Sequence, residues 1–276
     1  MNKVQLKNFI KKAKGDEKAE VVLKNGKIIN VFTGEIINAD VAIDKGIIIG
    51  IGSYTGEVEI DLEEKYLSPG FIDSHVHIES SMSSPSEFAR IIVPKGVTTI
   101  IADPHEIANV KGLEGVEYII EDSKNIPLDV HVMLPSCVPA TEFENSGAVL
   151  EAEDLGLLID NKAVLGLGEM MNYPNVIDAE DKILDKLILF KDKVIDGHGP
   201  GLRGKDLNAY VMAGIKTEHE CSTIEEVKDR LRLGMYILIR EGSAAKDLRN
   251  IISAVNKENL RRFMFCTDDK HPEDLI

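Results

Sequence analysis

The sequence contains few cysteines and no long apolar run. Its three cysteines, Cys137, Cys221 and Cys266, are odd in number, far apart and without a recurrent spacing. This pattern argues against a disulfide framework and favours a reducing compartment, so we expect a cytoplasmic protein. No stretch approaches the ~20 consecutive apolar residues that cross a bilayer, and we therefore expect a soluble chain with no membrane partner.

Positive charge is also scarce. Lysine and arginine together number 32, against 47 aspartate and glutamate residues, which gives a net charge of -15. Binding a phosphate backbone draws on clustered Lys and Arg, so this balance disfavours a nucleic-acid partner. Residues 1–19 hold many lysines, yet they lack the central apolar run and the small-residue cleavage site of a secretory signal. We expect an exposed amphipathic N-terminal helix there.

The remaining composition is that of a globular protein. Of the 276 residues, 43% are hydrophobic and 29% are charged. This length exceeds an average domain of roughly 150 residues, but it fits one α/β barrel with a modest extra layer. The sequence therefore allows a large core.

Short β-branched runs broken by glycine fill residues 20–67. The runs are Val21–Leu23, Lys27–Val31, Asp40–Ile43 and Gly46–Ile51. Asn25-Gly26 and Asp44-Lys45-Gly46 supply the positive-φ residues that tight hairpins require. The pattern predicts a small antiparallel sheet, an incomplete β domain that forms part of a small β-sandwich. Its boundary falls near Ser68-Pro69-Gly70.

From residue 68 to residue 276, strand-like apolar segments alternate with helical ones. The eight strand segments are Phe71–His77, Thr98–Asp103, Val130–Pro135, Val164–Met170, Lys193–His198, Gly214–His219, Met235–Arg240 and Phe263–Asp268. Ser222-x-x-Glu225 is typical of a capping box that opens a helix. Alternation indicates a parallel sheet, and eight repeats favour closure into a (β/α)8 TIM-type barrel of the α/β class. A doubly wound open sheet is the structural alternative.

His75 and His77 stand two residues apart at the end of the first of these strands. Side chains on a strand alternate sides, so both imidazoles point the same way and can reach one metal ion. Taken alone, the pair is also compatible with two solvated or hydrogen-bonded histidines.

Residue types that commonly bind metals also stand at the other strand ends. These ends read Asp103-Pro104-His105-Glu106, Gly168-Glu169-Met170, Asp196-Gly197-His198-Gly199, Glu218-His219-Glu220 and Thr267-Asp268-Asp269. Barrel enzymes place their chemistry at this edge. Burying several carboxylates in one cleft is costly without counter-charge, so a cation is the simplest way to hold them together. A metal site is the favoured interpretation.

The strand ends resemble the amidohydrolase superfamily, whose barrels carry His-x-His after the first strand, a carboxylate or modified Lys after the fourth, His after the fifth and sixth, and Asp after the eighth. Within it, four segments resemble the adenine deaminase family: Pro69–Met82, Asp103–Val110, Gly168–Asn172 and Asp196–His198. The resemblance implies a binuclear divalent metal centre, with Glu169 in the bridging place. The implied ligands are His75, His77, Glu169, His198, His219 and Asp268. It also implies manganese or iron, while imidazole and carboxylate ligands suit zinc too.

The same resemblance implies the reaction. A metal-bound hydroxide would attack the purine carbon that bears the exocyclic amine, so that adenine becomes hypoxanthine and ammonia, a step of purine salvage and adenine catabolism. Asp268 and Glu169 are the implied catalytic residues, and Asp268 would take the proton of water and relay it. Glu79, His105 and Glu106 would contact the substrate.

Plainer roles remain open for several of these residues. His105 and Glu106 can cap the helix that begins near Ile107, because acidic residues suit a helix N-terminus. Glu79 can cap its own loop. Asp269 competes with Asp268 as the ligand, although neighbouring strand residues face opposite sides.

Two other functions compete with adenine deamination. One is a related hydrolase that acts on another cyclic amide or amidine. The other is a shortened, non-catalytic chain that binds metal or a partner subunit, because the resemblance implies a longer protein. A homo-oligomer is compatible with each of them.

Overall fold

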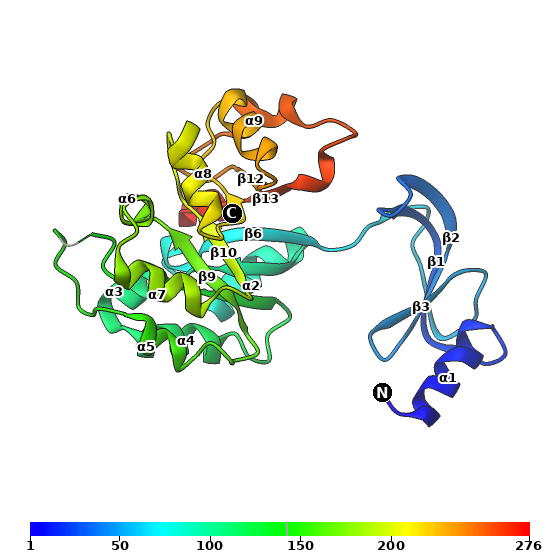
Figure 1. Ribbon diagram of the computed structural model, residues 1–276. Helices are drawn as coiled ribbons and strands as arrows, with labels where there is room; N and C mark the ends of the chain where they lie inside the picture. Colours follow the sequence, from blue (N-terminus) through cyan, green and yellow to red (C-terminus); the bar gives the residue numbers. More distant parts are fainter. Residues whose placement is uncertain (142) are drawn as a thin grey trace. The chain divides into compact units, whose positions relative to one another are not determined.

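The computed structural model describes residues 1–141 and 143–276. The chain forms two compact units, Met1–Pro69 and Gly70–Ile276 (Figure 1). Among the described residues, no helix combines the length and apolar character needed to cross a membrane.

The N-terminal unit is one helix and a mixed five-stranded sheet. Its elements are α1 (Lys3–Ala13), β1 (Ala19–Asn30), β2 (Glu35–Asp44), β3 (Ile47–Gly52), β4 (Gly56–Asp61) and β5 (Tyr66–Leu67). The strand order is β3-β2-β1-β4, and β5 also pairs with β1. The predicted antiparallel sheet is therefore wrong in part, because β4 and β5 run parallel to β1. The 12-residue β1 is long enough to offer both of them its free edge.

The predicted turn at Asn25-Gly26 is a second correction. The chain does not reverse there, and β1 continues through both residues with a bulge between Leu23 and Gly26. Asn25 has a φ of 55°. Asn-Gly suits a positive φ in a bulge as well as in a hairpin, so the dipeptide alone did not distinguish the two.

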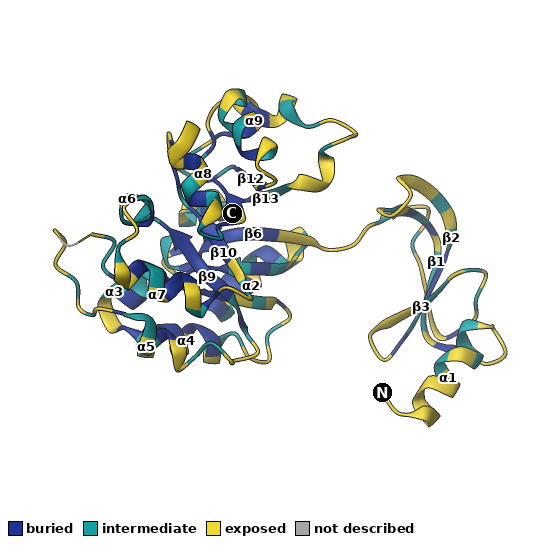
Figure 2. Cartoon of the chain, in the orientation of Figure 1, coloured by how far each residue is buried: buried dark blue, intermediate teal, exposed yellow. Residues whose placement is uncertain are grey.

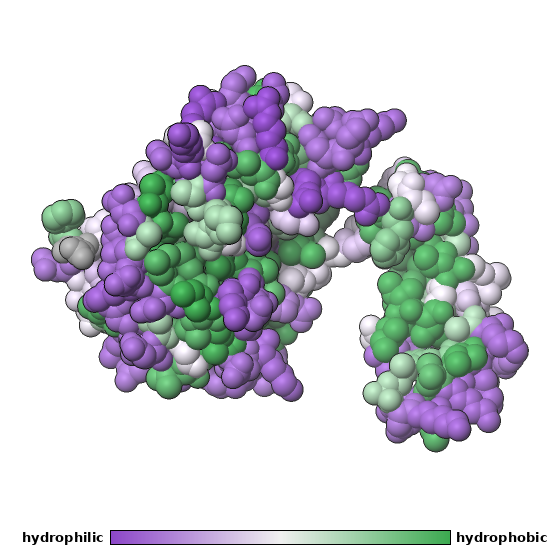
Figure 3. Space-filling model, viewed as in Figure 1, coloured by the Kyte–Doolittle hydropathy of each residue, from purple (hydrophilic) through white to green (hydrophobic). Residues whose placement is uncertain are grey.

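One face of this sheet is rich in exposed apolar side chains, which Figure 3 shows as a band on the N-terminal unit. Among them are Ile48 and Ile51, which line one groove together with Phe32. The described strands of Met1–Pro69 form a single sheet, so the predicted sandwich is not confirmed.

The larger unit is an α/β fold whose curled parallel strands, in one sheet of six and one of three, fit the predicted TIM-type barrel. Its strands are β6 (Phe71–His77), β7 (Val97–Ala102), β8 (Asp129–Leu134), β9 (Val164–Met170), β10 (Val194–Gly197), β11 (Thr217–Glu218), β12 (Tyr236–Arg240), β13 (Phe263–Cys266) and β14 (Asp268–Asp269). Neighbouring strands pair in parallel and in chain order from β6 to β10 and from β11 to β13. The amide of Lys216 donates to the carbonyl of Ile195 at 3.0 Å beside β10 and β11. Pairing of β14 with β6 then returns the sheet to its first strand.

Helices follow the strands and cover the outside of the barrel. They are α2 (Pro85–Ile92), α3 (His105–Lys111), α4 (Leu113–Asp122), α5 (Ala152–Gly156), α6 (Tyr173–Ile177), α7 (Asp181–Leu189), α8 (Gly204–Met212), α9 (Ile224–Arg232), α10 (Leu248–Ile251) and α11 (Pro272–Leu275). Figure 2 shows buried strands and helices with exposed outer faces. Val76 packs outward in the same core as Phe88 of α2. Alternation along β6 therefore sends His75 and His77 to the inside.

The capping box of α9 lies one residue later than predicted. Thr223 is the N-cap, and Glu226 reaches back to the amide of Thr223. Ser222 also donates to Glu226, so the hydroxyls of two neighbouring residues lie beside the same carboxylate.

Candidate metal centre

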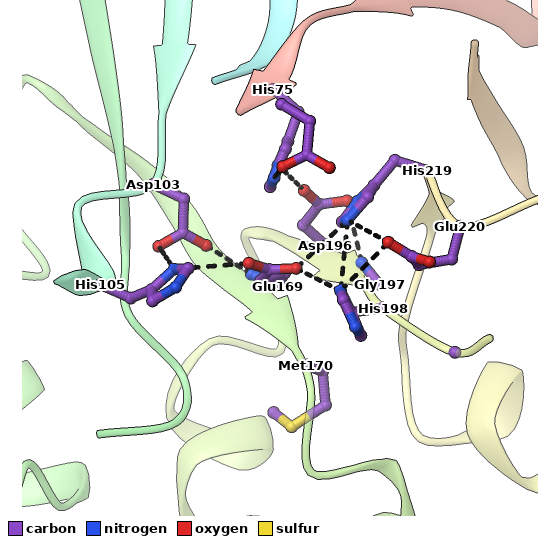
Figure 4. Close-up of polar contacts among 12 residues, drawn as sticks. His75, Asp103, His105, Glu169, Met170, Asp196, Gly197, His198, His219 and Glu220 are labelled. Carbon is purple, nitrogen blue, oxygen red and sulfur yellow. Dashed lines mark hydrogen bonds and ion pairs between the residues drawn. The ribbon is translucent and has the colours of Figure 1, made fainter. Parts of the chain in front are cut away.

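The residues at the carboxyl ends of the barrel strands converge on one centre (Figure 4). His75 and His77 come from β6, Glu169 from β9 and Asp268 from β14. His198 and His219 directly follow β10 and β11. The structure thus brings together all six predicted ligands, and five of them are buried, while His198 is half-buried.

The two histidines of β6 face each other. Nδ1 of His77 lies 2.8 Å from the carbonyl oxygen of Asp103, and Nδ1 of His75 lies 2.8 Å from Oδ2 of Asp196. Because a carbonyl and a carboxylate accept hydrogen bonds, both Nδ1 atoms carry the proton. The Nε2 atoms of the two rings face each other across 3.1 Å. A cation at this place could be bound by both Nε2 atoms.

Glu169 lies between the histidines from the other strands. Its Oε2 is 2.5 Å from Nδ1 of His198 and 3.2 Å from Nε2 of His219. Its Oε1 is 3.4 Å from Nδ1 of His105 and 3.5 Å from Nε2 of His77. Burial raises the pKa of Glu169, but hydrogen bonds from His198 and His219 outweigh it and hold the pKa well below its usual value. The carboxylate therefore stays ionised in a buried place.

Asp268 faces the same centre from β14, the strand beside β6. Its Oδ1 is 3.1 Å from Nε2 of His77, and its backbone is left-handed with a φ of 57°. Burial raises its pKa, but the hydrogen bond with His77 and the charges of nearby histidines lower it overall. Asp269 instead accepts a hydrogen bond from the hydroxyl of Ser80.

Histidine protonation follows the surrounding acids. Burial lowers the pKa of His75, yet the hydrogen bond to Asp196 raises it to about 9 overall. For His105, burial again opposes the interaction with Asp103, and the pKa rises to about 9. The rings thus lie in strongly negative surroundings, which favour a bound cation.

A cavity of about 240 Å³ opens beside these groups. Two of the predicted substrate contacts, His105 and Glu106, line it, and so do Arg240 and Glu220. Glu79 has another contact. Its Oε1 accepts from the amide of Ile107 at 3.3 Å, in the first turn of α3.

The donor set fits a divalent metal. Buried polar atoms without a hydrogen-bond partner include Nδ1 of His219, Nδ1 of His105 and Oδ1 of Asp103. Several groups of three acidic or imidazole residues, such as His75, His77 and Glu169, have ligand atoms within 4.8 Å of one another. Imidazole and carboxylate ligands of this kind suit manganese, iron or zinc.

The sequence did not reveal the residues that support the ligands. Oδ2 of Asp103 accepts from the amide of Glu169 at 2.7 Å, while Asp196 orients His75. Arg240 contacts Glu220, Asp247 and Asp268. The sequence does contain one indication that Arg240 is special, because it is the charged last residue of an apolar strand.

Comparison with known proteins identifies a family and several similar relatives. The model of the amidohydrolase family matches residues 66–271. An adenine deaminase from Clostridium acetobutylicum is 62% identical over 97% of this chain and 47% of its own length. One from Geobacillus kaustophilus is 54% identical over 98% of this chain and 47% of its own length. The chain thus spans about half the length of the curated relatives it matches.

Solved structures share the fold at low sequence identity. Atrazine chlorohydrolase TrzN from Arthrobacter aurescens TC1, complexed with zinc, matches with a TM-score of 0.62 and 14% identity, over 91% of this chain and 74% of that protein. D-hydantoinase matches with a TM-score of 0.56 and 17% identity, over 88% of this chain and 60% of that protein. At such low identity these likenesses show the fold alone.

Proposed function

This chain belongs to the amidohydrolase family, and from that premise we propose that it carries the metal-dependent centre of an adenine deaminase. The observation that carries the proposal is the pair of Nε2 atoms of His75 and His77, 3.1 Å apart beside Glu169 and Asp268. High identity to adenine deaminases over nearly the whole chain supports adenine as the substrate.

The proposed metal centre is binuclear. Glu169 is suited to bridge two ions because its Oε1 faces His77 while its Oε2 faces His198 and His219. His75 and Asp268 complete the set of ligands. Manganese or iron is the proposed metal, and zinc is compatible with the same donors. When bound, the metal supplies Lewis acidity that makes water a nucleophile at neutral pH.

The protein's own groups would handle the protons. Attack of water on the amine-bearing purine carbon forms a C–O bond, and departure of ammonia breaks the C–N bond. Asp268, whose pKa is lowered, is ionised and can accept the proton of water and pass it toward the leaving amine. His105 and Glu106 line the cavity and would contact the purine. Glu79, which accepts a hydrogen bond from the amide of Ile107 in the first turn of α3, is proposed as a third substrate contact.

A direct assay tests the proposal. Protein loaded with Mn²⁺ should convert adenine to hypoxanthine, as followed by ultraviolet absorbance and ammonia release. The His198→Ala variant should lose metal and activity together, whereas His271→Ala, at an exposed position outside the centre, should keep both. Hydrolysis of a cyclic amide without loss of adenine would favour another amidohydrolase activity. Metal binding without either reaction would favour a non-catalytic chain.

We also propose how the chain is divided into domains and where the protein is located. Residues 1–19 serve as an N-terminal helical segment, residues 20–67 as part of a small β-sandwich, and residues 68–276 as the hydrolase barrel. The exposed apolar sheet face supports the sandwich, because such a face is normally covered. A cytoplasmic location is supported by three free, buried thiols.

A further inference from the structure

Three fully buried polar side chains lie behind the loop that carries His198. They are Tyr210 of α8, Glu218 of β11 and Arg230 of α9, each with 0% exposure. None of them reaches the cavity lining, and none is among the predicted ligands. A buried charge pair is expensive to desolvate, so its presence calls for a specific role.

Tyr210 connects the ends of two strands through its hydroxyl. The hydroxyl donates to the carbonyl of Met170 at 2.8 Å and accepts from the amide of His198 at 2.9 Å. Met170 is the neighbour of Glu169, and His198 contacts Glu169 through its side chain at 2.5 Å. One oxygen atom therefore sets the backbone spacing of two residues that meet in the centre.

Arg230 and Glu218 hold the same loop from the other side. Arg230 donates to the carbonyls of Gly199 and Leu202 at 2.6 and 3.1 Å. Glu218 accepts from the amides of Gly199 and Glu220 at 3.1 and 3.0 Å. The two side chains approach each other to 3.6 Å. Together they join the loop after β10 to the segment that contains His219.

Gly199 shows how closely these groups enclose the loop. A Cβ atom at this position would lie 2.9 Å from Leu202, 3.1 Å from Glu218 and 3.4 Å from Tyr210. The backbone next to His198 is therefore confined by Leu202 of the same loop and by side chains from two other elements, β11 and α8. Such confinement fixes a loop that would otherwise be free to move.

We infer that Tyr210, Glu218 and Arg230 are positioning residues that hold Glu169, His198 and His219 at the spacing a divalent metal requires. The inference rests on the proposed function. Each of the three acts on backbone atoms next to a ligand, so none needs to contact metal or substrate. Outer groups that orient ligands typically contribute ~10 to 100-fold to metal affinity.

The decisive variant is Tyr210→Phe, which removes one oxygen atom and keeps the ring. Its matched control is Tyr54→Phe, which removes a hydroxyl that donates to the carbonyl of Ala13 at 2.7 Å in the N-terminal unit. We expect the dissociation constant for Mn²⁺ to rise ~10 to 100-fold in Tyr210→Phe and to stay unchanged in Tyr54→Phe. The visible spectrum of bound Co²⁺ should shift only in Tyr210→Phe, because it reports the geometry of the ligands.

A second variant, Arg230→Lys, keeps the charge but cannot donate to both carbonyls, and it should weaken Mn²⁺ binding in the same direction. Wild-type affinity and an unchanged Co²⁺ spectrum in folded Tyr210→Phe would overturn the inference, whatever the behaviour of Arg230→Lys. The proposed function fails separately if wild-type protein binds Mn²⁺ but leaves adenine intact. Wild-type protein that binds no Mn²⁺ would overturn both.

Discussion

At the residue scale, Arg240 shows how the centre tolerates so many acids. Its guanidinium lies 3.1 Å from Asp247 and 2.8 Å from Asp268, and it also contacts Glu220. Burial lowers the pKa of Arg240, but these carboxylates raise it, so the charge is permanent. One buried cation therefore offsets acids from three separate segments.

Replacing Arg240 by methionine should leave these acids without their partner. We expect Arg240→Met to lower the free energy of unfolding by about 3–5 kcal/mol, the usual cost of removing one member of a buried ion pair. Urea unfolding of the metal-free protein measures it. The matched control is Arg232→Met, whose exposed pair with Asp229 should contribute less than ~1 kcal/mol. Equal losses in the two variants would show that Arg240 has no special role.

At the element scale, local sequence decides where α9 begins. The hydroxyl of Thr223 accepts from the amide of Glu226 at 3.3 Å, and the amide of Thr223 donates to the carboxylate of Glu226 at 3.0 Å. Both bonds satisfy amides that the helix itself leaves unpaired. The helix so fixed carries Arg230 to its buried position.

Thr223→Ala should therefore destabilise the protein by about 0.5–2 kcal/mol, as loss of an N-cap does elsewhere. Thermal unfolding gives the measurement. Thr223→Ser keeps the hydroxyl and should retain most of the stability. If Ser222→Ala proved more harmful than Thr223→Ala, the originally predicted box would be the one that matters.

At the scale of the whole molecule, the apolar face of the N-terminal sheet stands out. Ile48 of β3 is 64% exposed and lies in the groove formed with Ile29, Phe32 and Ile51. Ile188 of α7 is also 64% exposed, but it lies on the barrel. Large exposed apolar patches promote association.

We expect Ile48→Lys to reduce self-association at high protein concentration, because a charge in the groove must be desolvated when the face is covered. Sedimentation velocity provides the test. Ile188→Lys, the same change at the same exposure, should have little effect. Identical behaviour of both variants would mean that association does not involve the sheet face.

The sequence predicted much of the barrel. The bounds of β6 and β9 coincide with the predicted strands Phe71–His77 and Val164–Met170. In each case an apolar run is followed by side chains that can bind a metal. Prediction from the sequence was ambiguous at positions where one residue pattern suits two conformations. Asn25-Gly26 fits a bulge as well as a turn, and Ser222 and Thr223 can both face Glu226.

By itself, the sequence determined the residue types, their order and the strand ends at which they stand, because periodicity and local propensity act over a few neighbouring residues. Only the tertiary structure decided which atoms meet. His75 and Asp196 are 121 positions apart in the sequence, and Arg240 and Asp268 are 28 apart. Local rules do not connect residues at such separations. Closure of the barrel creates these contacts, since it brings the ends of all its strands to one edge.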